Sequence, residues 1–189
     1  MNMMKKMMIG GAIAVIVAQS AIAQMDKLTQ IDIKEIQKIQ FVEVGQSLDA
    51  NTTLLFINNN TEEVVLRNAK FNVGLKVGDQ PLPMGLANIA ELKIPAATSS
   101  TAEDGSTSVT AGTLVQMLPV RVGPKDDATI QRLLAIFNVF GDPSTAYNMT
   151  LVGDCDVGFT VPGKGTVIQK GIGVEFEFAP EYKATTLAK

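Results

Sequence analysis

Residues 69–77 read AKFNVGLKV, and this stretch decides the fold. Apolar residues occupy every second position, with polar residues or glycine between them: Ala69, Phe71, Val73, Leu75 and Val77. Successive side chains of a β-strand point to opposite faces of a sheet. The two-residue period therefore predicts a strand with one buried face and one solvated face.

The same β-type patterning recurs on both sides of this stretch. Further strands are predicted at 37–44, 51–58, 88–94, 114–122, 147–161 and 172–178. Turn-forming residues separate them at 58–60, 78–81 and 162–165, and the small, polar segment 96–108 is predicted to be a long exposed loop. Closely spaced strands without alternating helices favour an antiparallel sandwich over a parallel sheet.

One segment has the helical period instead. Asp126 or Asp127 is suited to cap a helix, and Gly141-Asp142-Pro143 is suited to end it. Its apolar residues fall three or four positions apart: Ile130, Leu133, Leu134, Phe137 and Phe140. The sequence thus predicts an all-β fold, an immunoglobulin-like β-sandwich of about seven antiparallel strands with one inserted amphipathic helix at about residues 127–140.

The N-terminus has the form of a secretory signal. Lys5 and Lys6 precede an apolar run, and Ala21-Ile22-Ala23 fits the small-x-small cleavage pattern. An uncleaved membrane anchor is the alternative, because the apolar run of about 17 residues is at the short limit for a membrane span. We divide the chain into a signal peptide (1–23), a linker (24–35), a β-sandwich domain (36–180) and a tail (181–189), and expect the protein in the periplasm, secreted or at the cell surface.

Composition argues against common catalysis. The 189 residues include no histidine and one cysteine, so the usual general base and the Ser-His and Cys-His nucleophile pairs are missing. The net charge of −3 provides no basic surface for nucleic acid. We therefore expect no enzyme, no catalytic residue, no cofactor and no nucleic-acid partner, and membrane contact only if the N-terminal segment is uncleaved.

Two motifs nevertheless resemble functional sites. Residues 158–166 nearly spell a phosphate-binding loop, but such a loop must lead into a helix, and here β-type residues follow Gly165. Alternation places Asp154 and Asp156 on one face of a strand and Cys155 on the other. The two carboxylates are weak candidates for a metal site, and Cys155 is interpreted as a small buried apolar residue.

Several short segments resemble late embryogenesis abundant type 2 proteins, the WHy-domain family. Residues 54–60 (LLFINNN) resemble that family's apolar strand followed by Asn-Pro-Asn, although Asn59 stands where the family has proline. Residues 82–85 (LPMG) and 147–153 (YNMTLVG) resemble two further family segments, and the likeness covers about residues 36–178. The resemblance implies a seven-stranded sandwich with one helix, no known active site, and a role in desiccation, cold or stress tolerance.

Three functions stay open at this point. The first is a stress-protective module that binds other proteins. The second is a structural or adhesive subunit that assembles by strand addition, with residues 24–36 as the donated strand. The third is a small-ligand carrier with a pocket between the helix and the sheet.

Overall fold

A computed structural model describes residues 27–161 and 165–180 of the chain. The predicted signal peptide, the turn 162–164 and the predicted tail lie outside these ranges. The elements are β1 (Ile31–Val44), β2 (Ser47–Asn58), β3 (Val64–Val77), β4 (Gln80–Ile94), β5 (Thr98–Thr101), β6 (Thr107–Thr110), β7 (Gly112–Pro124), α2 (Asp127–Gly141), β8 (Asn148–Val161) and β9 (Gly165–Phe178).

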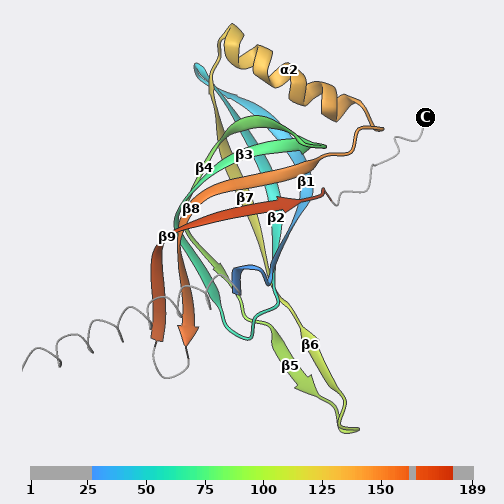
Figure 1. Ribbon diagram of the computed structural model, residues 1–189, viewed down its shortest axis with the longest axis vertical. Helices are drawn as coiled ribbons and strands as arrows, with labels where there is room; N and C mark the ends of the chain where they lie inside the picture. Colours follow the sequence, from blue (N-terminus) through green and yellow to red (C-terminus); the bar gives the residue numbers. More distant parts are fainter. Residues whose placement is uncertain (1–26, 162–164, 181–189) are drawn as a thin grey trace, which may run out of the picture.

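Seven strands form one antiparallel sheet in the order β1-β2-β7-β4-β3-β8-β9. The pairing between β4 and β7 is a single residue pair, Leu86 with Arg121, whereas the other neighbours pair over most of their lengths. At that joint a Cβ atom on Gly85 would lie 2.3 Å from the Arg121 carbonyl oxygen, so the approach requires glycine. The short joint lets the sheet fold into two facing layers, which makes the all-β sandwich predicted from the sequence (Figure 1).

The core lies between the inner faces of these layers. Four of the five alternating apolar residues of 69–77 are buried as predicted: Ala69, Phe71, Val73 and Leu75 are at most 1% exposed, whereas Val77 is half-buried. Other fully buried side chains come from several strands: Leu54, Phe56, Met84, Leu118, Met149 and Leu151. Burial of apolar area from both layers is the main stabilising contribution to such a fold.

The sheet begins earlier than the sequence suggested. β1 starts at Ile31, inside the segment predicted to be a linker. Its inward positions are Ile31, Ile33 and Glu35, all buried, and the inward-facing carboxylate interrupts the apolar pattern that would have indicated a strand. Residues 31–36 therefore belong to an edge strand paired with β2 and are not a detached donor strand.

The segment predicted as a long loop contains a hairpin. Strands β5 and β6 pair from Thr98–Thr110 to Thr101–Thr107, and every residue of both strands is exposed. The prediction of an exposed segment is confirmed, and the prediction of a loop is wrong. Both faces of these threonine-rich strands are exposed to solvent, so the sequence shows no apolar alternation that would predict them.

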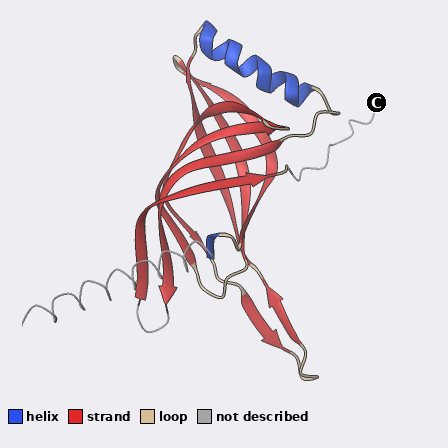
Figure 2. Ribbon diagram, in the orientation of Figure 1, coloured by secondary structure: helices blue, strands red, loops and turns tan. Residues whose placement is uncertain are grey.

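Helix α2 is the inserted helix, and it lies across one end of the sandwich (Figure 2). The predicted cap is Asp126, whose side chain accepts a hydrogen bond from the Thr129 amide. The buried stripe differs from the prediction, because it consists of Thr129, Leu133 and Ile136. The predicted apolar residues Ile130, Leu134 and Phe137 are instead 40–43% exposed. The helix packs on β4 and β7 at the sheet's end, so only a narrow stripe faces the core.

Candidate functional site

The larger of two hollows described below lies between the two outer strands of the sheet, β1 and β9. We call it the β1–β9 groove. A single parallel bridge from Glu35 to Pro180 joins the two strands at one end. Beyond that bridge no strand pairing connects them in the described part of the chain, and a cavity of about 500 Å³ lies between them. This volume falls within the range of about 300–1,000 Å³ that is common for ligand sites.

The groove has an apolar floor and a charged rim. From β1, Ile31 and Ile33 are buried; from β9, Phe178 is buried, while Val174 and Phe176 are half-buried. The Phe176 ring packs edge-on against Phe71 of the core, with 6.4 Å between ring centroids. The floor is therefore continuous with the core and fixed by it.

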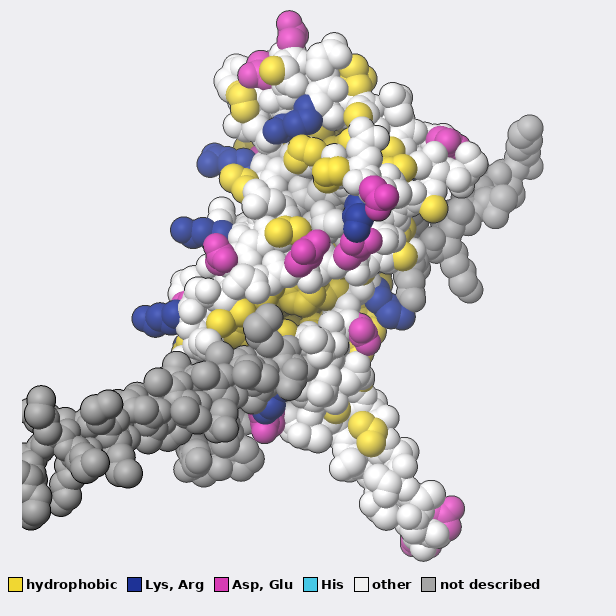
Figure 3. All heavy atoms as spheres, viewed as in Figure 1, with side chains coloured by type: hydrophobic (Ala, Val, Ile, Leu, Met, Phe, Trp, Pro, Cys, Tyr) yellow, Lys and Arg dark blue, Asp and Glu magenta, His cyan; other side chains and the backbone are white. Residues whose placement is uncertain are grey.

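Acidic side chains predominate at the rim, which is formed by Asp32, Lys34, Glu175 and Glu177. Glu177 is held on the outer face by Lys76, with 2.7 Å between Nζ and Oε2, and by Asn148. These hydrogen bonds lower the pKa of Glu177, that from Lys76 most. On this face, apolar side chains gather in a recess bordered by acidic ones (Figure 3).

Both walls of the groove are strand edges. β1 pairs with β2 and β9 pairs with β8, so each strand presents its second edge to the groove. An edge of this kind carries backbone N–H and C=O groups directed away from its own sheet. The site thus combines an apolar floor with two rows of backbone donors and acceptors.

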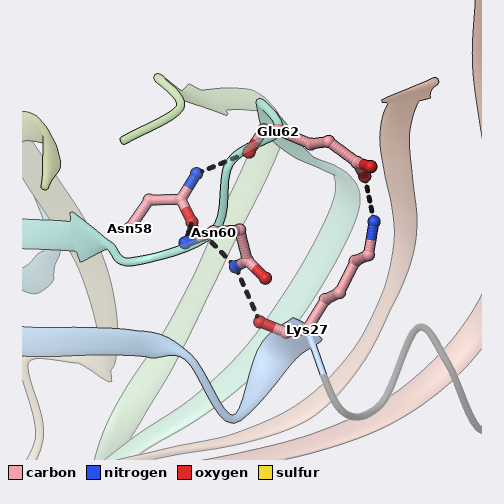
Figure 4. Close-up of polar contacts among 4 residues, drawn as sticks. All are labelled: Lys27, Asn58, Asn60 and Glu62. Atoms are coloured by element: carbon pink, nitrogen blue, oxygen red, sulfur yellow. Dashed lines mark hydrogen bonds and ion pairs between the residues drawn. The ribbon is translucent and has the colours of Figure 1, made fainter. Parts of the chain in front are cut away.

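The β1 wall is fixed by an asparagine network at the turn after β2 (Figure 4). The fully buried Asn58 side chain donates to the Glu62, Ile94 and Pro95 carbonyl oxygens at 2.9, 3.4 and 2.8 Å. Its Oδ1 accepts from the backbone and side-chain nitrogens of Asn60 at 2.9 and 2.8 Å. One side chain therefore satisfies polar groups from two segments of the chain, 60–62 and 94–95.

Asn59 and Asn60 connect this hydrogen-bond network to the groove. Asn60 Nδ2 donates to the Lys27 carbonyl oxygen at 3.0 Å, and the Asn59 backbone and side-chain nitrogens both donate to the Gln30 carbonyl oxygen. Asn59 also donates to the Asp32 carboxylate at 3.1 Å. Lys27 completes the arrangement with an ion pair to Glu62 and lies 4.9 Å above the Phe159 ring. The Asn58–Asn60 turn thus positions residues 27–32, the start of the β1 wall.

Glu35 lies at the closed end of the groove, with its side chain in the core. It has no exposed surface, and Oε1 accepts a hydrogen bond from the Thr52 hydroxyl at 3.2 Å. Oε2 has no hydrogen-bond partner among the residues that the structure describes. Burial raises the pKa of Glu35 to about 7, against the opposing effect of the Thr52 hydrogen bond. The carboxyl is therefore a titratable group inside the sandwich at neutral pH.

A second hollow, the helix cleft, lies where the sequence placed a possible carrier pocket. It has a volume of about 270 Å³ and is lined by Phe41, Val42, Glu43, Leu48, Lys125, Ile130, Leu133 and Phe137. The Phe41 and Phe137 rings meet edge-on with centroids 4.9 Å apart. This cleft is smaller than most small-molecule sites.

The residues proposed as weak metal candidates, Asp154 and Asp156, line neither hollow. Asp156 accepts hydrogen bonds from Asn68 Nδ2 at 2.8 Å and from the Gly171 backbone N–H at 3.0 Å. Asn68 has a φ of +50° in an irregular part of β3, and Gly171 a φ of +64° in β9. Asp156 thus ties three strands together where their pairing is irregular, and the hydrogen bond from Asn68 contributes most to lowering its pKa.

Asp154 lies on the same face of β8, opposite Gly173 of β9. Among the residues that the structure describes, no three His, Cys, Asp or Glu side chains come together as a metal site would require. Cys155 points the other way and is 2% exposed, as its strand position predicted. Burial, followed by the nearby Asp156 and Asp154, raises the pKa of its thiol to about 11.

The motif resembling a phosphate-binding loop belongs to a hairpin. Residues 162–164 lie outside the described ranges, but Val161 pairs with Gly165 and Thr160 with Thr166 on either side of them. Gly165 opens β9 and not a helix, so no helix N-terminus follows the motif.

Within 27–161 and 165–180, no helix is long and apolar enough to cross a membrane.

Comparison with known proteins gives similarity to solved structures alone. No protein-family model matches the sequence, and no curated protein matches it. A protein from Archaeoglobus fulgidus matches with a TM-score of 0.29 and 11% identity, over 79% of this chain and 96% of its own. A protein of Arabidopsis thaliana matches with a TM-score of 0.31 and 11% identity, over 82% of this chain and 85% of its own.

A candidate late embryogenesis abundant (LEA) protein, solved in solution, matches with a TM-score of 0.26 and 14% identity, over 91% of this chain and 86% of its own. TM-scores and identities at this level do not carry a function from these proteins to this chain.

Proposed function

We propose that this protein is a non-enzymatic module that binds other polypeptides through the β1–β9 groove. The observation that carries the proposal is the apolar cavity of about 500 Å³ that opens between two strand edges. The missing histidine and the buried Cys155 thiol, with its raised pKa, support a binding role over a catalytic one.

The finer role that we propose is protection of partly folded proteins outside the cytoplasm, under desiccation, cold or similar stress. The signal-like N-terminus supports export to the periplasm or cell surface. The resemblance of residues 54–60 to the WHy family supports the protective role. An exposed apolar groove suits this function, because unfolded clients present apolar segments that native proteins bury.

A client-protection assay tests the proposal. A labile enzyme is dried or frozen with the chain from Gln24 onward, which contains every described residue, and its residual activity is measured. Val174→Trp fills the groove, and Val167→Trp places the same side chain on the same strand outside it. We expect Val174→Trp to protect no better than an inert acidic protein, and Val167→Trp to protect as the parent chain does. Equal protection by both variants would overturn the proposal.

A second candidate, assembly of copies into a structural or adhesive subunit, is favoured by the same two open edges. Sedimentation across a range of concentrations distinguishes it. Assembly predicts a mass that rises with concentration in the parent chain and not in Val174→Trp.

A further inference from the structure

We infer that the β1–β9 groove takes an extended polypeptide segment, which adds as a strand between β1 and β9 with apolar side chains at alternate positions facing the floor. The inference rests on the proposed function and specifies how the partner is recognised. The end of β9 and the residue after it line the groove from Gly173 to Ala179, a length that fits a segment of about six residues, or about 20 Å.

Backbone groups make both walls of the groove polar. Each edge needs hydrogen-bond partners, because backbone groups that are covered without partners cost free energy. An apolar small molecule would cover these groups and leave them unsatisfied. The complement of a strand edge is another strand, which supplies donors and acceptors at the same spacing.

The two walls of the groove run in the same direction. The bridge between Glu35 and Pro180 is parallel, so the segment of β1 before Glu35 and the segment of β9 before Pro180 run in the same direction. One inserted strand can therefore run antiparallel to both of them. Such a strand would join the first and last strands of the sheet, so that every strand has two neighbours.

The chemistry of the floor and the rim of the groove specifies the side chains of the partner. Ile31, Ile33 and Phe176 lie on the inner faces, so inward residues of the added strand should be apolar. Asp32 and Glu175 lie on the outer faces, so outward residues should be basic. Because side chains of a strand alternate between faces, the preferred segment has a two-residue apolar–basic repeat.

Binding of a capped, fluorescently labelled peptide, VKVKVKV, tests the inference by fluorescence anisotropy. A peptide of the same composition with its valines and lysines in separate blocks controls for charge and overall apolarity. We expect the alternating peptide to bind at least tenfold more tightly than the block peptide. Val174→Trp should abolish this binding, and Val167→Trp should leave it unchanged.

Methylation of the peptide backbone separates strand addition from contact through side chains alone. Between two strands every central N–H donates to a wall, so each central N-methyl group should weaken binding about tenfold. If N-methylation has no effect while Val174→Trp still abolishes binding, strand addition is overturned and the groove remains a binding site. If no peptide binds but Val174→Trp still removes client protection, strand addition is again overturned and the proposed function stands. A concentration-dependent dimer that Val174→Trp abolishes, with no peptide binding, would assign the groove to a second copy and overturn the inference.

Discussion

The β1–β9 groove and the helix cleft are both apolar hollows at the border of the same core, but they are built from different parts of the chain. The groove lies between two strand edges, so backbone polar groups form its walls. The helix cleft lies between the side chains of α2 and those of β1 and β2, with the Phe41 and Phe137 rings in contact across it.

This difference determines what each hollow can recognise. A hollow walled by side chains selects ligands by their shape and apolarity. A hollow walled by strand edges also recognises the direction and hydrogen-bonding pattern of a peptide backbone. The two hollows also differ in their polar contacts. The Asn58–Asn60 network fixes the β1 wall of the groove. At the cleft, an ion pair joins Glu43 and Lys125, with 2.6 Å between Oε2 and Nζ.

Asn58→Ala should have the largest effect, since it removes the support of the β1 wall. Three backbone carbonyls and Asn60 lose a buried partner, and we expect a loss of about 4 kcal/mol in the free energy of unfolding. Urea denaturation measures the loss. Asn72→Ala, which removes an exposed hydrogen bond to Val152, should change stability by less than about 0.5 kcal/mol. A comparable loss in both variants would show that the network is not a special support.

Glu35→Gln tests the closed end of the groove. The pKa of the carboxyl is about 7 in the folded protein and near its ordinary value of 4.5 in the unfolded chain, so the folded state holds the proton more tightly. The free energy of unfolding should therefore fall as pH rises from about 4.5 to about 7, by about 3 kcal/mol from this group. Urea denaturation at pH 5, 6, 7 and 8 should show that fall in the parent relative to Glu35→Gln.

Glu91→Gln serves as a control for this pH series. Hydrogen bonds from Lys93 and then Arg67 lower the pKa of Glu91, so its contribution has the opposite sign and lies at lower pH. Parallel pH profiles of the parent and Glu35→Gln would contradict the assignment of the fall to Glu35.

A pair of neighbouring leucines tests the helix cleft. Leu133 is 2% exposed and lines the cleft, whereas Leu134 is 43% exposed. We expect Leu133→Ala to cost about 2.5 kcal/mol through lost burial and the remaining cavity, and Leu134→Ala less than about 1 kcal/mol. Thermal unfolding of both variants measures the difference. Equal losses in the two variants would instead support the apolar face that the sequence predicted, which contains both leucines.

Asp126→Ala should give the smallest measurable effect. It removes the hydrogen bond to the Thr129 amide at the start of α2, and we expect a loss of about 1 kcal/mol. Peptide binding in the groove should be unchanged, because α2 does not line it. A loss of peptide binding would indicate that the two hollows are coupled.

The sequence allowed most of the fold to be predicted, but not the candidate site. Two-residue periods located the strands of the main sheet because each has one buried face, and Asp126 with the Gly141 region located the helix. The start of β1 was not predicted because Glu35 occupies an inward position. The β5–β6 hairpin was not predicted because it has no buried face.

The groove itself depends on which strands lie at the two ends of the sheet. That order follows from pairings such as Leu86 with Arg121, which no local period encodes. The run Asn58–Asn60 was interpreted as a turn, and its hydrogen bonds to residues 27–32 were invisible without the fold. Alternation of Ile31 and Ile33 in the predicted linker was the one local signal that could have indicated this wall.

Because Cys155 is buried, the rate at which its thiol reacts measures how often the sandwich opens. Cys155 is the single cysteine of the chain, and in the folded state its pKa of about 11 leaves about one thiol in a thousand ionised at pH 8. A thiol reagent therefore reacts at an appreciable rate only after β8 separates from its neighbours. The same side chain can report, without any added label, how long the sandwich stays closed during drying, freezing or loading with a peptide.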